Sequence, residues 1–278
     1  MSAATRSVHV PQLGMELDLL ADDTIIGPSI ERGAWEEHET ALFRAHLEPG
    51  CQVLDLGANI GWFSAQAIRA GCEVHAFEPV PFIADVAEAN IERANALGPG
   101  RGVLHRFAAG SEPGTATIAL AGSNRGDNRV LDGGTLPDDM SGAESLEIRI
   151  ERVDDHVRGA TRVIKIDTQG SEWLALRGMR RLLSASQRCA LLLEFWPYAL
   201  RGCEPPQLLD LLRAEGFTVG KATAAPYPMT PERILRQASR RDPVRGGLDL
   251  YATRGGAPFH VLGAKARLRG LLRSWREE

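Results

Sequence analysis

The sequence contains few cysteines, and their spacing matches neither a metal site nor a disulfide framework. The four are Cys51, Cys72, Cys189 and Cys203, and no two of them form a Cys-x-x-Cys pair. A zinc site usually needs such closely spaced ligands, and a disulfide framework is typical of short secreted chains. We therefore predict no metal centre and no disulfide. We expect the cysteines to be small core residues in a reducing compartment.

Long apolar runs and an excess of positive charge are lacking as well. No run approaches the roughly 18 apolar residues of a membrane span, and no early segment combines a basic start with a long apolar stretch. The net charge of −4 disfavours a general nucleic-acid binder. The hydrophobic share of 44% and the charged share of 24% are ordinary for a globular protein. We expect a cytoplasmic protein with no membrane insertion and no nucleic-acid partner.

Apolar segments typical of strands alternate with segments typical of helices over most of the chain. The predicted strands are 53–56, 74–77, 103–108, 163–166, 190–195, 217–219 and 248–252. The predicted helices are 34–47, 62–70, 82–97, 172–183 and 206–215. This alternation indicates an α/β fold with a mostly parallel sheet and helices on both faces. Segment 114–120 is predicted to be an additional hairpin strand, and 121–143 a long loop, which is more often functional than idle.

The two ends of the chain differ from this central pattern, and we predict three regions. Residues 1–48 are expected to form a cap of strands and a helix, 49–256 the main domain, and 257–278 an amphipathic helix. The apolar stripe of that last helix consists of Leu268, Leu271, Leu272 and Trp275. Side chains at this spacing share one helix face. We expect the stripe to pack on this chain or on a second copy of it, which makes a homodimer a further expectation.

The first glycine-rich turn lacks the third glycine of a dinucleotide-binding turn. After the strand at 53–56 the sequence is Gly57-Ala58-Asn59-Ile60-Gly61, where a dinucleotide site would have Gly-x-Gly-x-x-Gly. Asp55 precedes the first glycine, and an acid there repels a phosphate and favours an ammonium group. Glu78 ends the next strand, where a carboxylate can hold a ribose diol. An ammonium group, a ribose and no phosphate describe S-adenosylmethionine, so a nicotinamide oxidoreductase is disfavoured.

Three stretches of the sequence resemble the FkbM family of S-adenosylmethionine-dependent methyltransferases. They are PGCQVLDLGANIGWFSAQA with FEPVP, then GDNRV, then VIKIDTQGSEWLALRGM followed by LLLEFWP. The resemblance runs from about residue 35 to residue 252. Family members typically have an acid two residues after the Asp of the third stretch, where this sequence has Gln169. The resemblance implies a Rossmann-like, doubly wound seven-stranded fold and S-adenosylmethionine as the methyl donor.

The resemblance also implies which residues bind the donor. The turn from Asp55 to Gly61 would lie under its methionine part, and Glu78 would hold its ribose hydroxyls. Small and apolar residues at the ends of neighbouring strands would lie beside the adenine. The expected donor-binding residues are Asp55, Gly57, Ala58, Asn59, Gly61, Glu78, Pro79, Ala109 and Asp167.

Carboxylates near strand ends are the candidates for catalysis. Methyl transfer needs alignment and exclusion of water, and an alcohol acceptor also needs a group that takes its proton. Asp167 follows one core strand, Glu194 ends another, and Glu172 begins the helix between them. Each has a plainer alternative, because Asp167 can cap a helix or bind the donor amine and Glu172 can offset a helix dipole. Clustered carboxylates can also hold Mg²⁺, which the resemblance does not require.

The loop SNRGDNRV, residues 123–130, is expected to form a lid or a substrate contact. Asn124, Asp127 and Asn128 would offer hydrogen bonds to a hydroxylated substrate, and Trp196 is a further candidate. We predict an O-methyltransferase that acts on a hydroxyl group of a small molecule such as a sugar, a glycosylated natural product or a polyketide. The alternatives are N- or carboxyl-methylation, methylation of a glycan or lipid head group, and a partner that binds the donor without catalysis.

Overall fold

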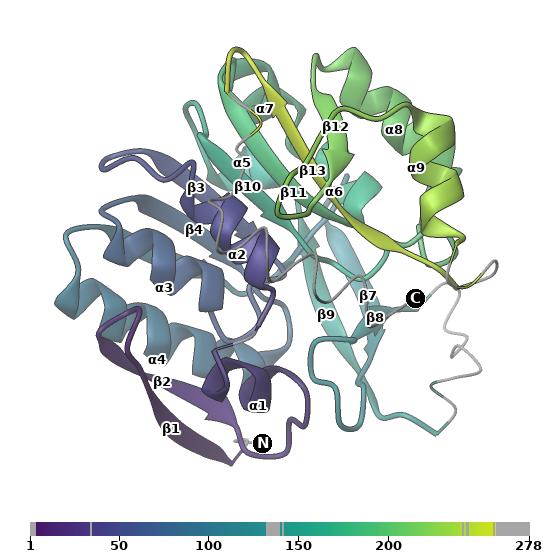
Figure 1. Cartoon of the computed structure of the whole chain (residues 1–278). Coiled ribbons are helices and arrows are strands. Elements are labelled where there is room, and N and C mark those ends of the chain that lie inside the picture. The colour runs from purple at the N-terminus through teal and green to yellow at the C-terminus, as the bar shows by residue number, and fades with distance from the viewer. Residues whose placement is uncertain are drawn as a thin grey trace.

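A seven-stranded sheet runs through the centre of the molecule and carries helices on both faces (Figure 1). The structure is a computed structural model, and it describes residues 4–33, 35–131, 140, 142–240, 242, 245–257 and 259. The strands of this sheet are β3 (Gln52–Leu56), β4 (Glu73–Phe77), β5 (Arg101–His105), β10 (Val163–Ile166), β11 (Cys189–Phe195), β12 (Thr218–Lys221) and β13 (Leu248–Arg254). Their order is β12-β13-β11-β10-β3-β4-β5. β13 is antiparallel to both neighbours, and the remaining pairs are parallel.

The direction in which the chain builds the sheet reverses between β3 and β10. From β3 the chain continues outward through β4 and β5, and from β10 it continues outward on the other side. Leu56 lies opposite both Ile166 and Phe77, so the three central strands end level with one another. Open α/β sheets bind ligands in the crevice beyond the carboxyl ends of their strands at such a reversal. The fold therefore places a crevice where β3, β4 and β10 end.

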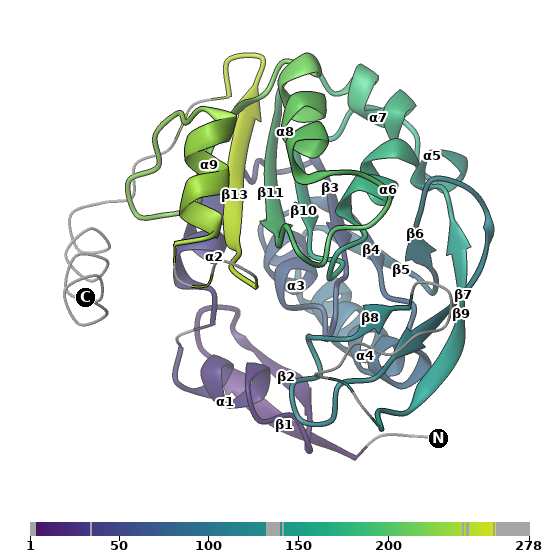
Figure 2. The same ribbon diagram turned by 90° about the vertical axis from the view of Figure 1, so that its right-hand side faces the viewer.

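Two helical layers cover the sheet (Figure 2). One layer contains α2 (Glu37–Arg44), α3 (Trp62–Arg69) and α4 (Pro81–Leu97), and the other contains α5 (Val153–His156), α6 (Glu172–Arg177), α7 (Arg180–Ala185), α8 (Pro205–Ala214) and α9 (Pro231–Ala238). Because successive strand residues point to opposite faces, each strand supplies both layers. Val53 belongs to the core under α3 and α4, whereas Leu54 and Leu56 belong to the opposite core.

The N-terminal elements pack on the outside of α4. They are β1 (Thr5–Val10), β2 (Met15–Leu20) and α1 (Ile26–Glu31), and β1 and β2 form an antiparallel hairpin. Buried Asn90 of α4 joins this hairpin to the core, since its amide nitrogen donates to the carbonyl oxygens of Asp18 at 2.9 Å and Ile60 at 2.8 Å. The buried apolar side chains of β2 belong to the same core cluster as those of α3.

A second, four-stranded sheet lies beside the first. Its order is β6-β9-β7-β8, with β6 (Ala108–Ala109), β7 (Gly114–Ala119), β8 (Arg129–Val130) and β9 (Ser145–Glu151). The hairpin strand expected at 114–120 is β7, and its main partner is β9. The segment expected to be an unstructured loop contains β8, which pairs with β7.

The predicted α/β fold with a mostly parallel sheet is confirmed, and two further local expectations are wrong. The strand expected at 103–108 ends at His105, and the helix expected at 172–183 is divided into α6 and α7. The division lies at Gly178, where a Cβ atom would come within 1.9 Å of the carbonyl oxygen of Gly110. Helices α5 and α9 were not expected from the sequence. The predicted helix at 257–278 falls, apart from residues 257 and 259, outside the described residues.

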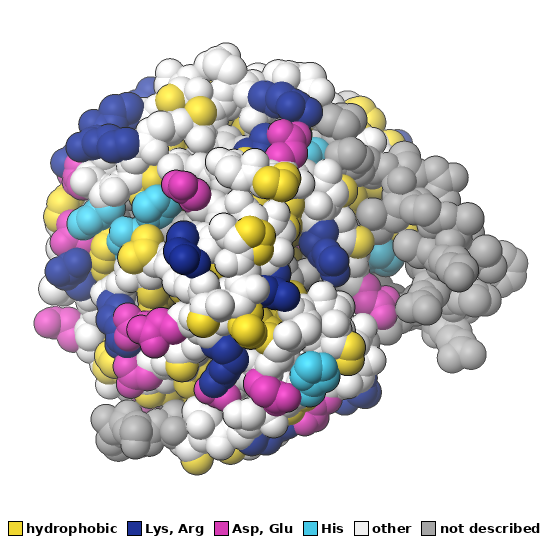
Figure 3. Space-filling view, turned by 90° about the vertical axis from the view of Figure 1, so that its left-hand side faces the viewer, with side chains coloured by type: hydrophobic (Ala, Val, Ile, Leu, Met, Phe, Trp, Pro, Cys, Tyr) yellow, Lys and Arg dark blue, Asp and Glu magenta, His cyan; other side chains and the backbone are white. Residues whose placement is uncertain are grey.

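The surface of the described part carries both signs of charge. On the face in Figure 3, acidic and basic side chains alternate without one large patch of either sign. Within the same described residues, no helix is both long enough and apolar enough to cross a membrane.

Candidate active site

A cavity of about 230 Å³ opens at the carboxyl ends of β3, β4 and β10. Seven of the expected donor-binding residues line it: Gly57, Ala58, Asn59, Glu78, Pro79, Ala109 and Asp167. The expected catalytic or substrate-binding residues on its wall are Glu194, Asn124, Asp127, Asn128 and Trp196. The fold thus brings most of the candidate residues to one cavity, although they come from distant parts of the sequence.

The turn after β3 can approach β10 closely because its first residue is glycine. Gly57 has a φ of 78°, and a Cβ atom there would lie 1.8 Å from the carbonyl oxygen of Asp167. The backbone N–H groups of Gly57 and Ala58 both donate to the carbonyl oxygen of Phe77, at 3.0 and 2.9 Å. The turn is therefore held between the ends of β4 and β10, and no larger residue fits at its start.

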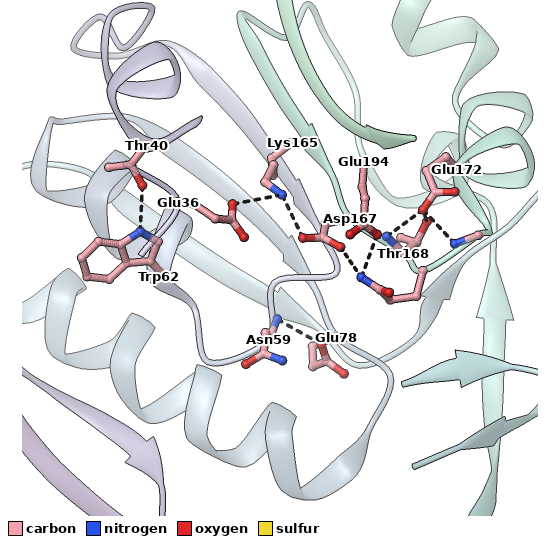
Figure 4. Close-up of polar contacts among 12 residues, drawn as sticks. Glu36, Thr40, Asn59, Trp62, Glu78, Lys165, Asp167, Thr168, Glu172 and Glu194 are labelled. Atoms are coloured by element: carbon pink, nitrogen blue, oxygen red, sulfur yellow. Dashed lines mark hydrogen bonds and ion pairs between the residues drawn. The ribbon is translucent and has the colours of Figure 1, made fainter. Parts of the chain in front are cut away.

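Glu78 accepts hydrogen bonds from the same turn. One carboxylate oxygen accepts from the backbone N–H of Asn59 at 3.0 Å (Figure 4). The other accepts from the backbone N–H of Val80 at 3.0 Å. Burial raises the pKa of Glu78 to about 7, although both hydrogen bonds favour its ionised form. Asn59 adopts a left-handed φ of 51°, which Asn tolerates better than most residues. Its side-chain amide donates to the carbonyl oxygen of Arg125 at 3.0 Å, so it also joins the turn to the loop above the cavity.

Three candidate residues do not line the cavity. The Asp55 carboxylate is buried and accepts a hydrogen bond from the Ser64 hydroxyl at 2.6 Å, which ties the end of β3 to α3. Burial raises its pKa to about 6. Gly61 has a φ of 83° and is the residue before α3. The Asp55 carboxylate meets Ser64 and does not line the cavity. In this geometry it does not offer the direct contact with a donor ammonium group that the sequence suggested.

Glu172 is the third of them, and its carboxylate organises the loop after β10. The same oxygen accepts from the backbone N–H and the hydroxyl of Thr168, at 3.1 and 3.0 Å, and from the N–H of Gly170 at 3.0 Å. It is 1% exposed, and burial raises its pKa. The structure gives Glu172 a positioning task behind the wall of the cavity and no access to a substrate.

A buried lysine lies at the centre of the acidic side chains of the cavity. Lys165 and Asp167 point to the same side of β10, and the Nζ atom lies 2.9 Å from Oδ2 of Asp167 and 3.5 Å from Oε2 of Glu36 (Figure 4). It also lies 5.0 Å from the centre of the Phe63 ring. Burial opposes the charge of Lys165, but the surrounding carboxylates hold its pKa well above the ordinary value. Lys165 therefore provides the positive charge that pairs with both Asp167 and Glu36.

The pKa values of Asp167 and Glu194 shift in opposite directions. Burial works against ionisation of Asp167, but Lys165 and the hydrogen bonds to its carboxylate hold its pKa below the ordinary value. Burial and the neighbouring acids raise the pKa of Glu194 well above its ordinary value. The side-chain amide of Gln169 donates to Asp167 at 2.9 Å and to Glu194 at 2.7 Å. An amide suits this position, because a third carboxylate could not donate to either acid.

The loop predicted as a lid covers the glycine turn and the N-terminal segment holds it there. Its Ser123 carbonyl oxygen accepts from the backbone N–H of Thr24 at 2.9 Å. The Asn128 amide nitrogen donates to the Arg125 carbonyl oxygen at 2.9 Å, and its oxygen accepts from the N–H of Ala121 at 2.9 Å. Asn128 therefore shapes the loop, and substrate contact by this residue stays a prediction.

The sequence interpretation missed Glu36 and treated Lys165 as a plain strand residue. Glu36 lines the cavity from the N-terminal segment, far from the other site residues in sequence. The sequence did indicate a special role for Lys165, because a lysine inside the buried strand 163–166 needs charged or hydrogen-bonding partners. No local sequence pattern indicates that Glu36 belongs to the site. Within the described residues, no group of three or more metal-ligating side chains is arranged to hold a metal ion.

The model of a family described as the methyltransferase FkbM domain matches residues 55–219. No curated protein matches the chain.

Solved structures of several methyltransferases are similar at low identity. One is a methyltransferase FkbM from Methylobacillus flagellatus, with 20% identity and a TM-score of 0.45, covering 77% of this chain and 50% of that one. Another is a magnesium protoporphyrin IX methyltransferase from Synechocystis, with 14% identity, a TM-score of 0.45 and coverage of 83% and 84%. A third is a TehB-like methyltransferase from Corynebacterium glutamicum, with 14% identity, a TM-score of 0.43 and coverage of 82% and 94%. The chain spans half the length of the first, and at these scores the likenesses say nothing about substrate.

Proposed function

This chain belongs to the FkbM methyltransferase family, and from that premise we propose that it transfers a methyl group from S-adenosylmethionine to a hydroxyl group of a small molecule. The cavity suits this donor in two respects. Gly57 lets the backbone of β3 and the end of β10 meet without an intervening side chain, and Glu78 presents a carboxylate at the end of the next strand. When bound, S-adenosylmethionine supplies an electrophilic methyl group on a positively charged sulfur.

The observation that carries the proposal is the arrangement of acids around Lys165. Asp167 and Glu194 both line the cavity, and the pKa of Asp167 is lowered while that of Glu194 is raised. An alcohol gains nucleophilicity when a neighbouring carboxylate accepts its hydrogen bond, and it loses its proton to such a group as the methyl group arrives. We place the acceptor on the side of Asp167 and Glu194. Trp196 and the polar residues of the lid, Asn124 and Asp127, would contact it.

The acidic side chains that line the cavity also affect which class of acceptor can bind there. A carboxylate acceptor would meet the acids that line the cavity and would be repelled, which disfavours carboxyl methylation. A neutral hydroxyl compound avoids this cost. An amine is the second candidate, because the same acids would attract a cationic amine before it loses its proton. A sugar, a glycosylated natural product or a polyketide fits the first class.

Three further predictions remain open. They are a cytoplasmic location, a homodimer, and the division into a cap at 1–48, a main domain at 49–256 and a C-terminal helix at 257–278. Size measurement in solution tests the second, and limited proteolysis tests the third. None of them is needed for the proposed chemistry.

Ligand binding and methyl transfer, measured in that order, test the proposed function. A thermal-shift titration with S-adenosylmethionine, S-adenosylhomocysteine and NAD should show stabilisation by the first two alone, because a ligand that binds only the native state stabilises it by mass action. Alcohols are then compared with amines of matched skeleton as acceptors. Methylation of alcohols supports the proposal, and methylation confined to the amines would replace it with the second candidate.

A further inference from the structure

Three non-glycine residues in the described part of the chain have a positive φ, and all three line the cavity. They are Glu36 at 41°, Asn59 at 51° and Gln169 at 51°. This backbone region is strained for such residues, and strained residues cluster at functional sites. Asn59 supports the turn, and Gln169 bridges two acids. Glu36 is the member of this set for which the site description above gives no task.

The position of Glu36 is fixed by the helix that follows it. Glu36 precedes α2, whose Leu42 and Phe43 are fully buried. The indole N–H of Trp62 donates to the Thr40 hydroxyl at 3.1 Å, which fastens α2 to the start of α3 (Figure 4). The Glu36 carboxylate is therefore held at the cavity by a packed helix.

The hydrogen bonds of the cavity acids separate Glu36 from the others. Both oxygens of Glu78 accept backbone N–H groups, and both oxygens of Asp167 accept side-chain N–H groups. Glu194 accepts from Gln169. Oε2 of Glu36 is buried against Lys165, 3.5 Å away in an ion pair, and 23% of the Glu36 side chain remains exposed. Glu36 therefore keeps one oxygen beside Lys165 while its carboxylate lines the cavity wall.

The charges around Glu36 set its affinity for a proton. Lys165 and Asp167 face it from β10, Asp249 from β13, and Glu39 from its own helix. Burial raises the pKa of Glu36 to about 7, and Lys165 opposes that rise. Asp167, whose pKa is lowered, holds a proton far less well. A general base is most effective when its pKa lies near the working pH, and Glu36 meets that condition better than Asp167.

We propose that Glu36 accepts the proton of the acceptor hydroxyl, an inference that rests on the proposed function. As the hydroxyl oxygen bonds to the methyl carbon, its O–H bond breaks toward the Glu36 carboxylate. The electron pair of the carbon–sulfur bond goes to sulfur, so the sulfonium and the carboxylate become a thioether and a carboxyl group. Lys165 then favours release of the proton from Glu36, because its charge stabilises the carboxylate. Asp167 and Glu194 remain as groups that orient the acceptor.

Proton release on donor binding tests the position of Glu36 without any acceptor. Calorimetric titration with S-adenosylmethionine near neutral pH, in buffers of different ionisation enthalpy, measures the protons released. We expect release by the wild type, since the positive donor lowers the pKa of a carboxyl that faces it. Glu36→Gln should release fewer protons. Glu39→Gln, which removes a neighbouring acid of similar pKa on the same helix, should keep most of the release, because it leaves the Glu36 carboxyl in place. Equal release by Glu36→Gln and the wild type would overturn the inference.

The pH dependence of methyl transfer tests the catalytic part. With an alcohol that the wild type methylates, Glu36→Gln should lower kcat at saturating S-adenosylmethionine by about 10² to 10⁴. The rise of kcat/KM near neutral pH should disappear in Glu36→Gln and persist in Glu36→Asp and Glu39→Gln. An unchanged kcat and pH profile in Glu36→Gln would refute the assignment. If the wild type methylates no alcohol, the proposed function fails, and the proton-release measurement still decides whether Glu36 faces the donor.

Discussion

Replacement of Lys165 by methionine should destabilise the protein far more than the loss of a comparable surface cation. Lys165 is 2% exposed, and its Nζ atom lies 2.9 Å from Asp167 and 3.5 Å from Glu36. Methionine keeps the apolar length of the side chain but leaves these partly buried carboxylates without their cation. Removal of one partner from a buried ion pair typically costs about 3 to 5 kcal/mol. We expect a loss of that size in the free energy of unfolding of Lys165→Met.

Arg106→Met is the matched control. Arg106 also pairs with two carboxylates, at 2.8 Å from Asp85 and 2.5 Å from Glu88, but its side chain is 40% exposed. Exposed ion pairs contribute about 0 to 1 kcal/mol each. The two variants therefore remove the same number of ion pairs and differ in burial. Urea unfolding followed by circular dichroism measures both losses.

The loss in Lys165→Met should also depend on pH. Without the cation, the pKa values of Asp167 and Glu36 rise in the folded state, which then binds more protons near neutral pH than the unfolded chain does. Stability falls as pH rises wherever the native state binds more protons. The difference from the wild type should therefore be larger at about pH 8 than at about pH 5. A loss no greater than that of Arg106→Met, or one that grows toward low pH, would refute this account of the cluster.

Three further predictions follow from the cavity. Gly57→Ala should cost about 2 to 5 kcal/mol, from a strained φ and an overlap of its Cβ with the carbonyl oxygen of Asp167; an unchanged urea midpoint would contradict this. Glu78→Ala should weaken S-adenosylmethionine binding by about tenfold or more, since a charged hydrogen-bond acceptor is lost; equal affinities by calorimetry would remove Glu78 from donor binding. The free energy of unfolding should fall as the pH rises from about 4.5 to about 7, because burial raises the pKa of Glu39 and Asp249 to about 7 and the native state binds more protons than the unfolded chain over that range. Glu39→Gln should reduce that fall, and an identical pH curve for this variant would exclude Glu39 as a contributor.

The strands and helices of the central sheet could be predicted because apolar runs and helical spacing are local features of the sequence. The strand Val163–Ile166 is buried at every position. A short, mainly apolar run predicts such a strand whatever its place in the sheet. The division between α6 and α7 has another origin. It depends on the close approach of Gly178 to Gly110, and that contact joins segments that no local pattern connects.

The site was predictable where a residue directly follows a strand. Gly57, Glu78 and Asp167 each come after a strand of the central sheet, and parallel strands end at one edge, so their convergence could be inferred. The direction of the Asp55 side chain could not be inferred in the same way, and in the structure its carboxylate accepts a hydrogen bond from Ser64 of α3. The sequence alone does not show to which face of the sheet a residue near the end of a strand will point.

Glu36 could not be predicted because its role depends on tertiary packing. It reaches the cavity through the docking of α2 on α3, and its importance follows from the charges of β10 and β13 around it. Glu172 illustrates the opposite case. Its place at the start of a helix suggested chemistry, whereas its hydrogen bonds to Thr168 and Gly170 assign it to the loop.

Methyl transfer to an alcohol tests the central claim most directly. The wild type is incubated with S-adenosylmethionine carrying an isotope-labelled methyl group and with alcohols and amines of matched skeleton, and the products are examined by nuclear magnetic resonance and mass spectrometry. The account predicts a labelled methoxy group on an alcohol, formed in step with S-adenosylhomocysteine. Label found as an N-methyl group or a methyl ester, or S-adenosylmethionine bound without transfer to any alcohol, would contradict it.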